Sequence, residues 1–201
     1  LPSAAVLPNG LDPGMDSAAP AHRSLEFEIL TVSRLSNSDN YKGIDHLIQA
    51  MPAIRRAIPA ARLRVVGRGD DVPRLHEIAE KLHLGQAVSF LGYVDDAELQ
   101  RELDNCRLFA LPSQKEGFGL VFLEAMIHGK PCVGSREGGI PEVISPEAGV
   151  LVNYGDVPGL ARACIEALRR DWDSAAIQAR AGEFSYSHFR DNLASLLPIS
   201  A

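Results

Sequence analysis

Residues 108–134 read LFALPSQKEGFGLVFLEAMIHGKPCVG and place one helical pattern between two short apolar runs. The runs at 108–111 and 132–134 have the length and composition of buried strands. Gly129 is placed to end the helix between them, and Pro131 is placed to start the second strand. A strand–helix–strand unit of this size predicts parallel strands in one sheet.

The same alternation continues through most of the chain. Four further apolar runs predict strands at 25–32, 62–66, 87–91 and 150–152. Helical patterns lie between the strands, at 44–58, at 75–82, after a cap at Asp95 and from near Asp156. The predicted fold class is therefore α/β, with a single Rossmann-like, doubly wound parallel sheet.

The two ends of the chain carry different patterns. Residues 1–22 are punctuated by proline and glycine, lack an initiator methionine and have no basic stretch before the apolar one. This is typical of a linker between domains and not of a signal peptide. We expect a Rossmann-like domain at 23–182 and, at 183–201, a helix that packs on a domain outside this sequence. The chain is interpreted as a fragment of a longer polypeptide.

The composition suits one soluble domain, with 201 residues, 46% hydrophobic and 23% charged. A net charge of −6 argues against binding to nucleic acid or to an acidic membrane surface. No apolar run approaches the roughly 18 residues of a membrane span. The three cysteines lie in apolar segments, which favours reduced, buried residues in a cytoplasmic protein. The six histidines show no metal-ligand spacing, so no protein-bound metal is expected.

Two carboxylates, Glu116 and Glu124, lie on either side of the turn Gly117-Phe118-Gly119. Glu124 is the only charged residue between Gly117 and Ile127, so its burial on an apolar helix would require a partner. The N–H groups of the turn would face an anion at the start of the helix, where the helix dipole favours negative charge. The pattern indicates a phosphate site with two carboxylates suited to sugar hydroxyls. A structural alternative stays open, in which Glu116 caps the helix and Glu124 pairs with a buried cation.

Two more loops follow predicted strands, at the edge of the sheet where ligands bind. The loop SRLSNSDNYKG carries Arg34 and Lys42, two cations that could hold a diphosphate, although an ordinary solvated loop would have the same composition. The loop VGRG contains Gly67, which either lets a ligand approach the backbone or simply ends the strand. It lacks the third glycine of the dinucleotide-binding fingerprint.

Residues 92–95 and 136–142 complete the set of loops. An extended backbone at Val94 could hydrogen-bond a flat base, while a tight turn with Asp95 as a helix cap explains the same residues. The run REGGIPE at 136–142 predicts a rigid turn with exposed N–H groups, either for a phosphate or sugar carboxylate or as a plain connection. His128 is assigned no chemistry. All the loops except the turn at His128 are predicted at one edge of the sheet, which favours a shared binding site.

The run EGFGLVFLEAMIHGKPCVGSREGGIPEVI, preceded by SRL and YKGIDHLI, resembles retaining glycosyltransferases of the GT-B type, in family four, also called group 1. The resemblance covers roughly residues 25–170 and includes two glutamates separated by seven residues. The leading VLPNGLD resembles the junction between the two domains of that family. The resemblance implies that this chain is the C-terminal, nucleotide-sugar-binding half.

The resemblance also implies a role for each matching residue. As catalytic residues, Arg34 and Lys42 would neutralise the donor diphosphate, and Glu116 would face the transferred sugar. Glu124 would accept hydrogen bonds from the ribose. The other donor-binding residues would border the phosphates and the base: Gly117, Phe118, Gly119, Leu120, Gly67 and Val94. The implied reaction transfers a sugar from a nucleoside diphosphate to an acceptor hydroxyl with retention, by front-face attack, without a cofactor or a metal.

The acceptor, a glycan, a lipid or a small molecule, would bind through the N-terminal half, which would also make any peripheral membrane contact. That half would supply a catalytic histidine, so the isolated chain is expected to bind donor weakly and to transfer nothing. Three alternatives stay open: a nucleotide-sugar epimerase of GT-B-like architecture, a non-catalytic nucleotide-sugar-binding module and a dinucleotide dehydrogenase. The sequence does not specify the base, the sugar or the acceptor.

Overall fold

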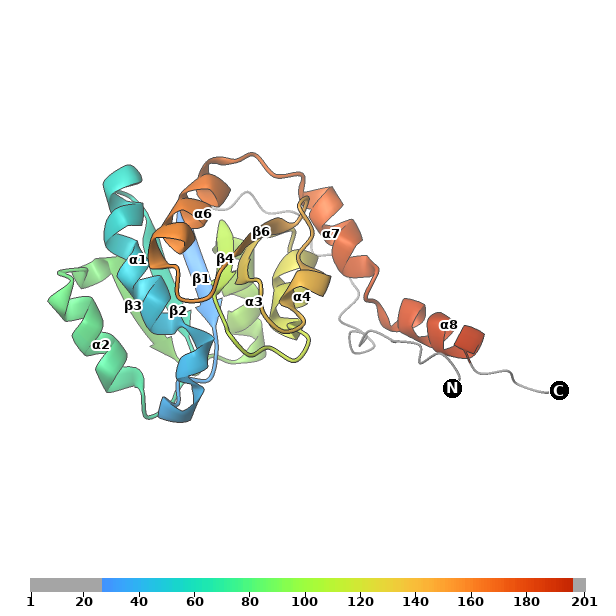
Figure 1. Ribbon diagram of the computed structural model, residues 1–201, viewed down its shortest axis with the longest axis horizontal. Coiled ribbons are helices and arrows are strands. Elements are labelled where there is room, and N and C mark those ends of the chain that lie inside the picture. Colours follow the sequence, from blue (N-terminus) through green and yellow to red (C-terminus); the bar gives the residue numbers. More distant parts are fainter. Residues whose placement is uncertain (1–26, 197–201) are drawn as a thin grey trace.

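The computed structural model describes residues 27–196 of the chain (Figure 1). The linker predicted at 1–22 lies outside the described residues, as does the tail beyond residue 196. Within 27–196, no helix combines the length and the apolar character needed to cross a membrane.

Six parallel strands form one sheet in the order β3-β2-β1-β4-β5-β6. The strands are β1 (Glu28–Val32), β2 (Arg62–Val66), β3 (Val88–Gly92), β4 (Leu108–Leu111), β5 (Cys132–Ser135) and β6 (Gly149–Val152). Each begins and ends within three residues of an apolar run in the sequence. The predicted α/β class with one doubly wound parallel sheet is confirmed.

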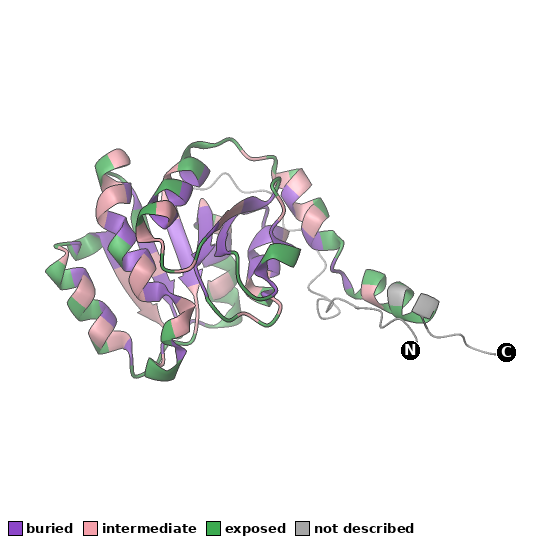
Figure 2. Cartoon of the chain, in the orientation of Figure 1, coloured by how far each residue is buried: buried purple, intermediate pink, exposed green. Residues whose placement is uncertain are grey.

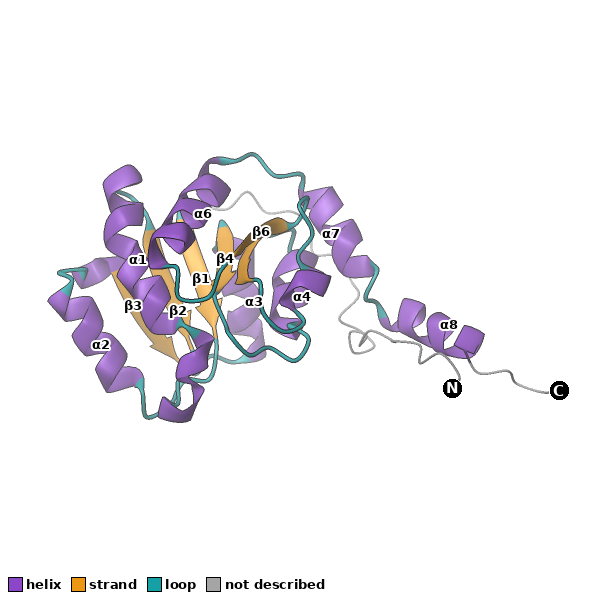
Figure 3. Ribbon diagram, viewed as in Figure 1, coloured by secondary structure: helices purple, strands orange, loops and turns teal. Residues whose placement is uncertain are grey.

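Helices cover both faces of the sheet (Figure 3). One face carries α1 (Ile44–Ala57), α2 (Val72–Lys81) and α6 (Val157–Arg169), and the other carries α3 (Asp96–Asn105), α4 (Leu120–Ile127) and α5 (Ile140–Val143). Two 3-10 helices, η1 (Asn37–Lys42) and η2 (Gly85–Ala87), lie in loops, and α7 (Ser174–Gly182) packs on α4. The Asp95 side chain accepts a hydrogen bond from the Glu98 N–H at 2.8 Å, so the cap predicted there is confirmed.

The last described helix, α8 (Tyr186–Leu196), extends away from the sheet (Figure 1). Its described residues are mostly exposed (Figure 2), including Leu193. The sequence pattern counts Phe184 with this helix, but Phe184 lies in the turn before it and is buried. The packing of α8 on another domain stays a prediction.

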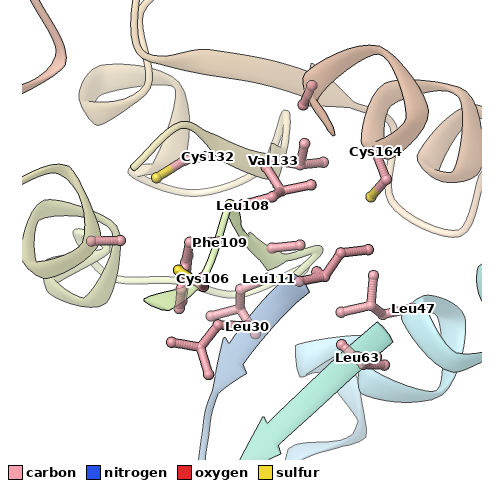
Figure 4. Close-up of a cluster of buried hydrophobic side chains, with 14 of the residues drawn as sticks. Leu30, Leu47, Leu63, Cys106, Leu108, Phe109, Leu111, Cys132, Val133 and Cys164 are labelled. Carbon is pink, nitrogen blue, oxygen red and sulfur yellow. The ribbon is translucent and has the colours of Figure 1, made fainter. Parts of the chain in front are cut away.

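The sheet is buried on both faces, which is why its strands read as continuous apolar runs. All of β4 is buried, and the Phe109 ring meets Phe122 of α4 edge-on at 5.4 Å between centroids. Cys106, Cys132 and Cys164 are free and buried, as predicted, and Figure 4 shows them among the leucines of the core. Burial raises the pKa of Cys106 and Cys164 to about 12, so these thiols stay protonated at neutral pH.

The middle of the sheet contains a topological switch point. Strands β1 and β4 are neighbours, but the chain leaves β1 toward β2 and leaves β4 in the opposite direction, toward β5. The loops after these two strands diverge and open a crevice at the carboxyl edge, where ligands bind in open α/β sheets. The sheet thus places the loop with Arg34 opposite the loop with Glu116.

Candidate functional site

A cleft of about 600 Å³ opens at the switch point. Its walls are the end of β1 with the following loop, η1, and the loop that leads from β4 into α4. Seven of the ten predicted site residues line it: Arg34, Lys42, Glu116, Gly117, Phe118, Gly119 and Leu120. Glu124, Gly67 and Val94 lie outside its lining. The volume is within the usual range for a small-molecule site, roughly 300–1,000 Å³.

Arg34 is held in place by a buried aspartate of η1. Its Nε donates a hydrogen bond to Asp39 Oδ2 at 2.5 Å, and the Tyr41 hydroxyl donates to the other carboxylate oxygen at 2.9 Å. The Asp39 side chain is 5% exposed, whereas that of Arg34 is 73% exposed and remains accessible to a ligand. The Arg34 hydrogen bond lowers the pKa of Asp39. Sequence reasoning missed Asp39 and Tyr41; an acid between two cations in a strand-end loop was the signal for Asp39.

Lys42 and Glu116 form an ion pair across the cleft. Lys42 Nζ lies 2.6 Å from Glu116 Oε2, and the two side chains are 19% and 17% exposed. The pair joins the loop after β1 to the loop after β4. Gly43 lets these loops approach, because it has a φ of 70° and an added Cβ would lie 2.5 Å from the Pro112 carbonyl oxygen. An anionic ligand in the cleft would compete with the Glu116 carboxylate for Lys42.

The start of α4, residues 117–121, forms a helix mouth with free backbone donors. Gly119 is the N-cap, at φ 90° and ψ 40°, and no side chain caps the helix, so the alternative in which Glu116 caps it is wrong. The N–H groups of residues 117–121 donate to no acceptor within the described chain, and the first paired donor is Phe122. An added Cβ on Gly119 would lie 2.9 Å from the Phe122 ring. Unpaired N–H groups and the helix dipole together favour an anion here.

Glu124 lies one turn into α4 and is half-buried, less than its sequence context predicts. Burial raises the pKa of its carboxyl, and the charge of Asp96 raises it further. No described residue forms an ion pair or hydrogen bond with Glu124, so the alternative of a buried cation partner is wrong for residues 27–196. Asp96 begins α3 just after the end of β3, so the charge that acts on Glu124 comes from that side of the sheet.

Sequence relatives identify the family of the chain. The profile described as "Glycosyl transferases group 1" matches residues 26–170. The chain belongs to the group 1 glycosyltransferases. N-acetyl-alpha-D-glucosaminyl L-malate synthase of Bacillus anthracis is 39% identical over 158 residues, which are 78% of this chain and 40% of that protein. Glycogen synthase of Mycobacterium tuberculosis is 38% identical over 178 residues, which are 88% of this chain and 42% of that protein.

The chain of this group 1 glycosyltransferase thus spans about two fifths of the length of these relatives. Among solved structures, Anabaena Alr3699/HepE in complex with UDP matches with a TM-score of 0.76 and 26% identity, over 96% of this chain and 56% of that one. The pneumococcal O-GlcNAc transferase GtfA, in complex with UDP and GlcNAc, shares the fold with a TM-score of 0.78 and 21% identity, over 90% of this chain and 37% of that one. The predicted resemblance to the group 1 family and its GT-B fold is confirmed.

Gly67 follows β2, which lies beside β1 at the cleft, and Val94 follows β3, the edge strand on the far side of β2. Gly67 has a φ of 141°, and an added Cβ would lie 1.8 Å from the Ser33 carbonyl oxygen, so glycine is needed where β2 meets the loop that carries Arg34. The Val94 side chain is buried, and its backbone N–H and carbonyl have no hydrogen bond within the described residues. Free backbone groups suit contact with a base, and that contact stays a prediction.

The turn at 136–142 supports the helix mouth of the glycosyltransferase. The Gly139 N–H donates to the Glu116 carbonyl at 3.1 Å, and the Arg136 N–H donates to the Val152 carbonyl at 2.8 Å. The Ile140 and Glu142 N–H groups are also paired, with the carbonyls of Glu137 and Gly139. The prediction of exposed N–H groups is therefore wrong for these four residues. Gly138 has a φ of 57°, and an added Cβ would lie 2.3 Å from the Glu116 carbonyl oxygen, so the paired glycines allow close packing on this loop.

His128 lies at the opposite end of α4 from the helix mouth. Its Nδ1 is 2.7 Å from Asp104 Oδ1 and its Nε2 is 2.7 Å from Gln100 Oε1, which ties α4 to α3. This structural role agrees with the absence of chemistry assigned to His128. Among residues 27–196, no group of three or more His, Cys, Asp or Glu side chains could hold a metal ion.

Proposed function

We propose that the cleft binds the diphosphate of a nucleotide sugar, and that this chain is the donor-binding, C-terminal half of a retaining hexosyltransferase. One observation carries the proposal: the Lys42–Glu116 pair and the free donors of the helix mouth meet in one cleft. A cation and an uncapped helix N-terminus suit a diphosphate, and a carboxylate suits sugar hydroxyls. The group 1 family and the transferases among its relatives support sugar transfer over the epimerase and dehydrogenase alternatives.

The diphosphate would occupy the helix mouth, with Lys42 and Arg34 supplying positive charge. As the bond between the anomeric carbon and the phosphate oxygen breaks, negative charge grows on the leaving diphosphate. Donors and cations that already point at this group stabilise that charge without reorganisation, and removal of one such donor costs roughly 100- to 1,000-fold in turnover. Asp39 contributes by holding the Arg34 guanidinium before the ligand arrives.

Glu116 and Glu124 would serve different parts of the donor. Once Lys42 turns to the phosphate, Glu116 can bind the transferred sugar or stabilise the positive charge that develops at its anomeric carbon. Glu124, which lacks a described partner, would accept hydrogen bonds from the ribose hydroxyls. The Val94 backbone and Gly67 would border the base and phosphates. Retention would follow from front-face attack, in which the acceptor hydroxyl approaches on the side from which the diphosphate leaves and gives it a proton.

The rest of the proposal concerns the complete protein. An N-terminal half would bind the acceptor, a glycan, a lipid or a small molecule, make any peripheral membrane contact, and receive α8. Together the halves would work in the cytoplasm without a cofactor or metal. The 201-residue chain alone would bind donor and transfer nothing, because the acceptor side of the cleft and the catalytic histidine belong to the other half. Measurable sugar transfer by the purified chain would contradict this part.

Calorimetry tests the binding site directly. The 201-residue chain is titrated with UDP, GDP and ADP, beside the variant Lys42→Ala. We expect one diphosphate to bind most tightly and Lys42→Ala to weaken it by at least tenfold, the order expected for a lost charged contact. Negligible binding of all three at millimolar concentration would count against the site.

A further inference from the structure

Phe184 connects the C-terminal segment of the chain to the helix mouth. It lies in the turn between α7 and α8, is 8% exposed, and meets the Phe118 ring edge-on at 5.5 Å between centroids and 71° between planes. Phe118 stands between Gly117 and Gly119 and therefore carries the only side chain of this tripeptide in the helix mouth. Two flanking glycines give this segment little conformational restraint of its own, so an anchor for the phenylalanine ring limits its freedom.

A second contact runs from the same segment to the same place. The Arg180 guanidinium stacks on the Phe184 ring at 4.8 Å and donates hydrogen bonds to the carbonyls of Glu142 and, at 3.2 Å, Val143 in α5. The turn that leads into α5 packs on the helix-mouth loop through Gly139, whose N–H bonds the Glu116 carbonyl. The end of α7 therefore reaches the helix mouth by two routes, one aromatic and one through α5.

We propose that Phe184 is a positioning residue for the donor diphosphate. Its ring holds Phe118, and Phe118 holds the N–H groups of Gly117 and Gly119 toward the cleft. A loop that is already ordered binds more tightly because it loses less freedom on binding. Since α8 begins two residues after Phe184, the placement of α8 and the affinity for diphosphate are linked, and linkage of this kind acts in both directions. This inference rests on the proposed function.

The test compares Phe184→Ala, Phe184→Leu and Phe184→Tyr in the 201-residue chain. Each is titrated with UDP, GDP and ADP and with the corresponding nucleosides, followed by amide chemical shifts in NMR spectra. We expect Phe184→Ala to weaken the tightest diphosphate about three- to tenfold, the size of one lost aromatic contact, with nucleoside affinity unchanged. Phe184→Tyr keeps the ring and should bind the diphosphate as tightly as the unaltered chain does. Ligand-free Phe184→Leu should shift the amide signals of Gly117 and Gly119.

Trp172→Ala is the matched control. Its indole Nε1 donates to the Ala167 carbonyl, and its loss removes a large aromatic side chain of the α6–α7 connection without a contact at the helix mouth. It should lower Tm and leave both affinities unchanged. If Phe184→Ala does not fold, Phe184→Leu, which keeps most of the side-chain volume, takes its place. It is judged by the same comparison of diphosphate affinity with nucleoside affinity. The inference is overturned if the substitution weakens diphosphate and nucleoside binding equally, or if the amide signals of Gly117 and Gly119 do not shift. Failure of the unaltered chain to bind any diphosphate refutes the proposed function instead.

Discussion

Replacing Glu116 by glutamine should tighten the binding of UDP to the chain while it lowers sugar transfer by the complete enzyme. The Glu116 carboxylate lies 2.6 Å from Lys42 Nζ and neutralises the cation that would bind the diphosphate under the proposed function. Glutamine has nearly the same shape and keeps one oxygen acceptor, so the substitution removes mainly the negative charge. UDP carries no transferred sugar and should gain from this loss, whereas turnover should suffer because the sugar loses its carboxylate.

The expected size follows from the position of the pair. Both side chains are only 19% and 17% exposed, which lowers the local dielectric, but the cleft that they line is open to solvent, which raises it. We therefore take an effective dielectric between that of a protein surface and that of water. A unit charge about 6 Å from the diphosphate, at an effective dielectric of about 40, contributes about 1.4 kcal/mol. This corresponds to about tenfold tighter binding at low ionic strength and to less in high salt, because salt screens the repulsion.

Calorimetry with UDP in low-salt and high-salt buffer measures the effect. Glu147→Gln is the matched control, since it removes the same charge from an exposed residue just before β6, at the amino edge of the sheet and away from the cleft. We expect less than a twofold change for this control at either ionic strength, because the distance is long and the charge is solvated. If Glu116→Gln binds UDP no better than the unaltered chain in low salt, Glu116 does not compete with the diphosphate for Lys42.

Asp39→Asn should weaken UDP binding severalfold in the same assay, because Arg34 loses the charged acceptor of its Nε hydrogen bond. Glu124→Gln should raise Tm at pH 7.5 by a few degrees and weaken nucleoside binding in calorimetry. Burial raises the folded-state pKa of Glu124 above the unfolded value of about 4.3, so the stability that the protonated carboxyl contributes is complete below that value and is lost as pH rises through the folded pKa. The gain in Tm of the variant over the unaltered chain should therefore be present at pH 7.5 and absent at about pH 3.5. Gly119→Ala should lower the free energy of unfolding in urea by about 1–3 kcal/mol and weaken UDP binding, because φ is 90° and the new Cβ would lie 2.9 Å from the Phe122 ring.

Burial on both faces made the strands predictable from the sequence. Each strand of a covered parallel sheet is a short apolar run with a clear end, and β4, LFAL, is buried at every position. The helix α7 was missed because its sequence, SAAIQARAG, has weak periodicity. Its Ile177 and Ala181 are buried through packing on α4, where Gly129 leaves room for Ser174, and tertiary packing of this kind has no local signal.

The site was predictable in its location and less so in its contacts. Strand ends collect at one edge of a parallel sheet whatever the strand order, so the loops with Arg34 and Glu116 could be assigned to one site. The ion pair between Lys42 and Glu116 depends on β1 lying beside β4, which the sequence does not specify. The role of Asp39 depends on the fold of η1, which buries its carboxylate between Arg34 and Tyr41.

The helix mouth and Glu124 both lack a partner among the described residues, and a purely structural role does not explain this. Three other helices begin with an aspartate whose side chain accepts from a backbone N–H of the first turn: α3 at Asp95, α6 at Asp156 and α7 at Asp173. The helix α4 begins instead at Gly119, with its donors unpaired, and carries a half-buried carboxylate whose pKa burial has raised. A side-chain cap would pair the free N–H groups, and a neighbouring cation would stabilise the Glu124 carboxylate. Neither is present among the described residues, which disfavours stability as the reason for this sequence. A nucleoside diphosphate would relieve both at once, because its phosphates accept from the helix mouth and its ribose donates to Glu124.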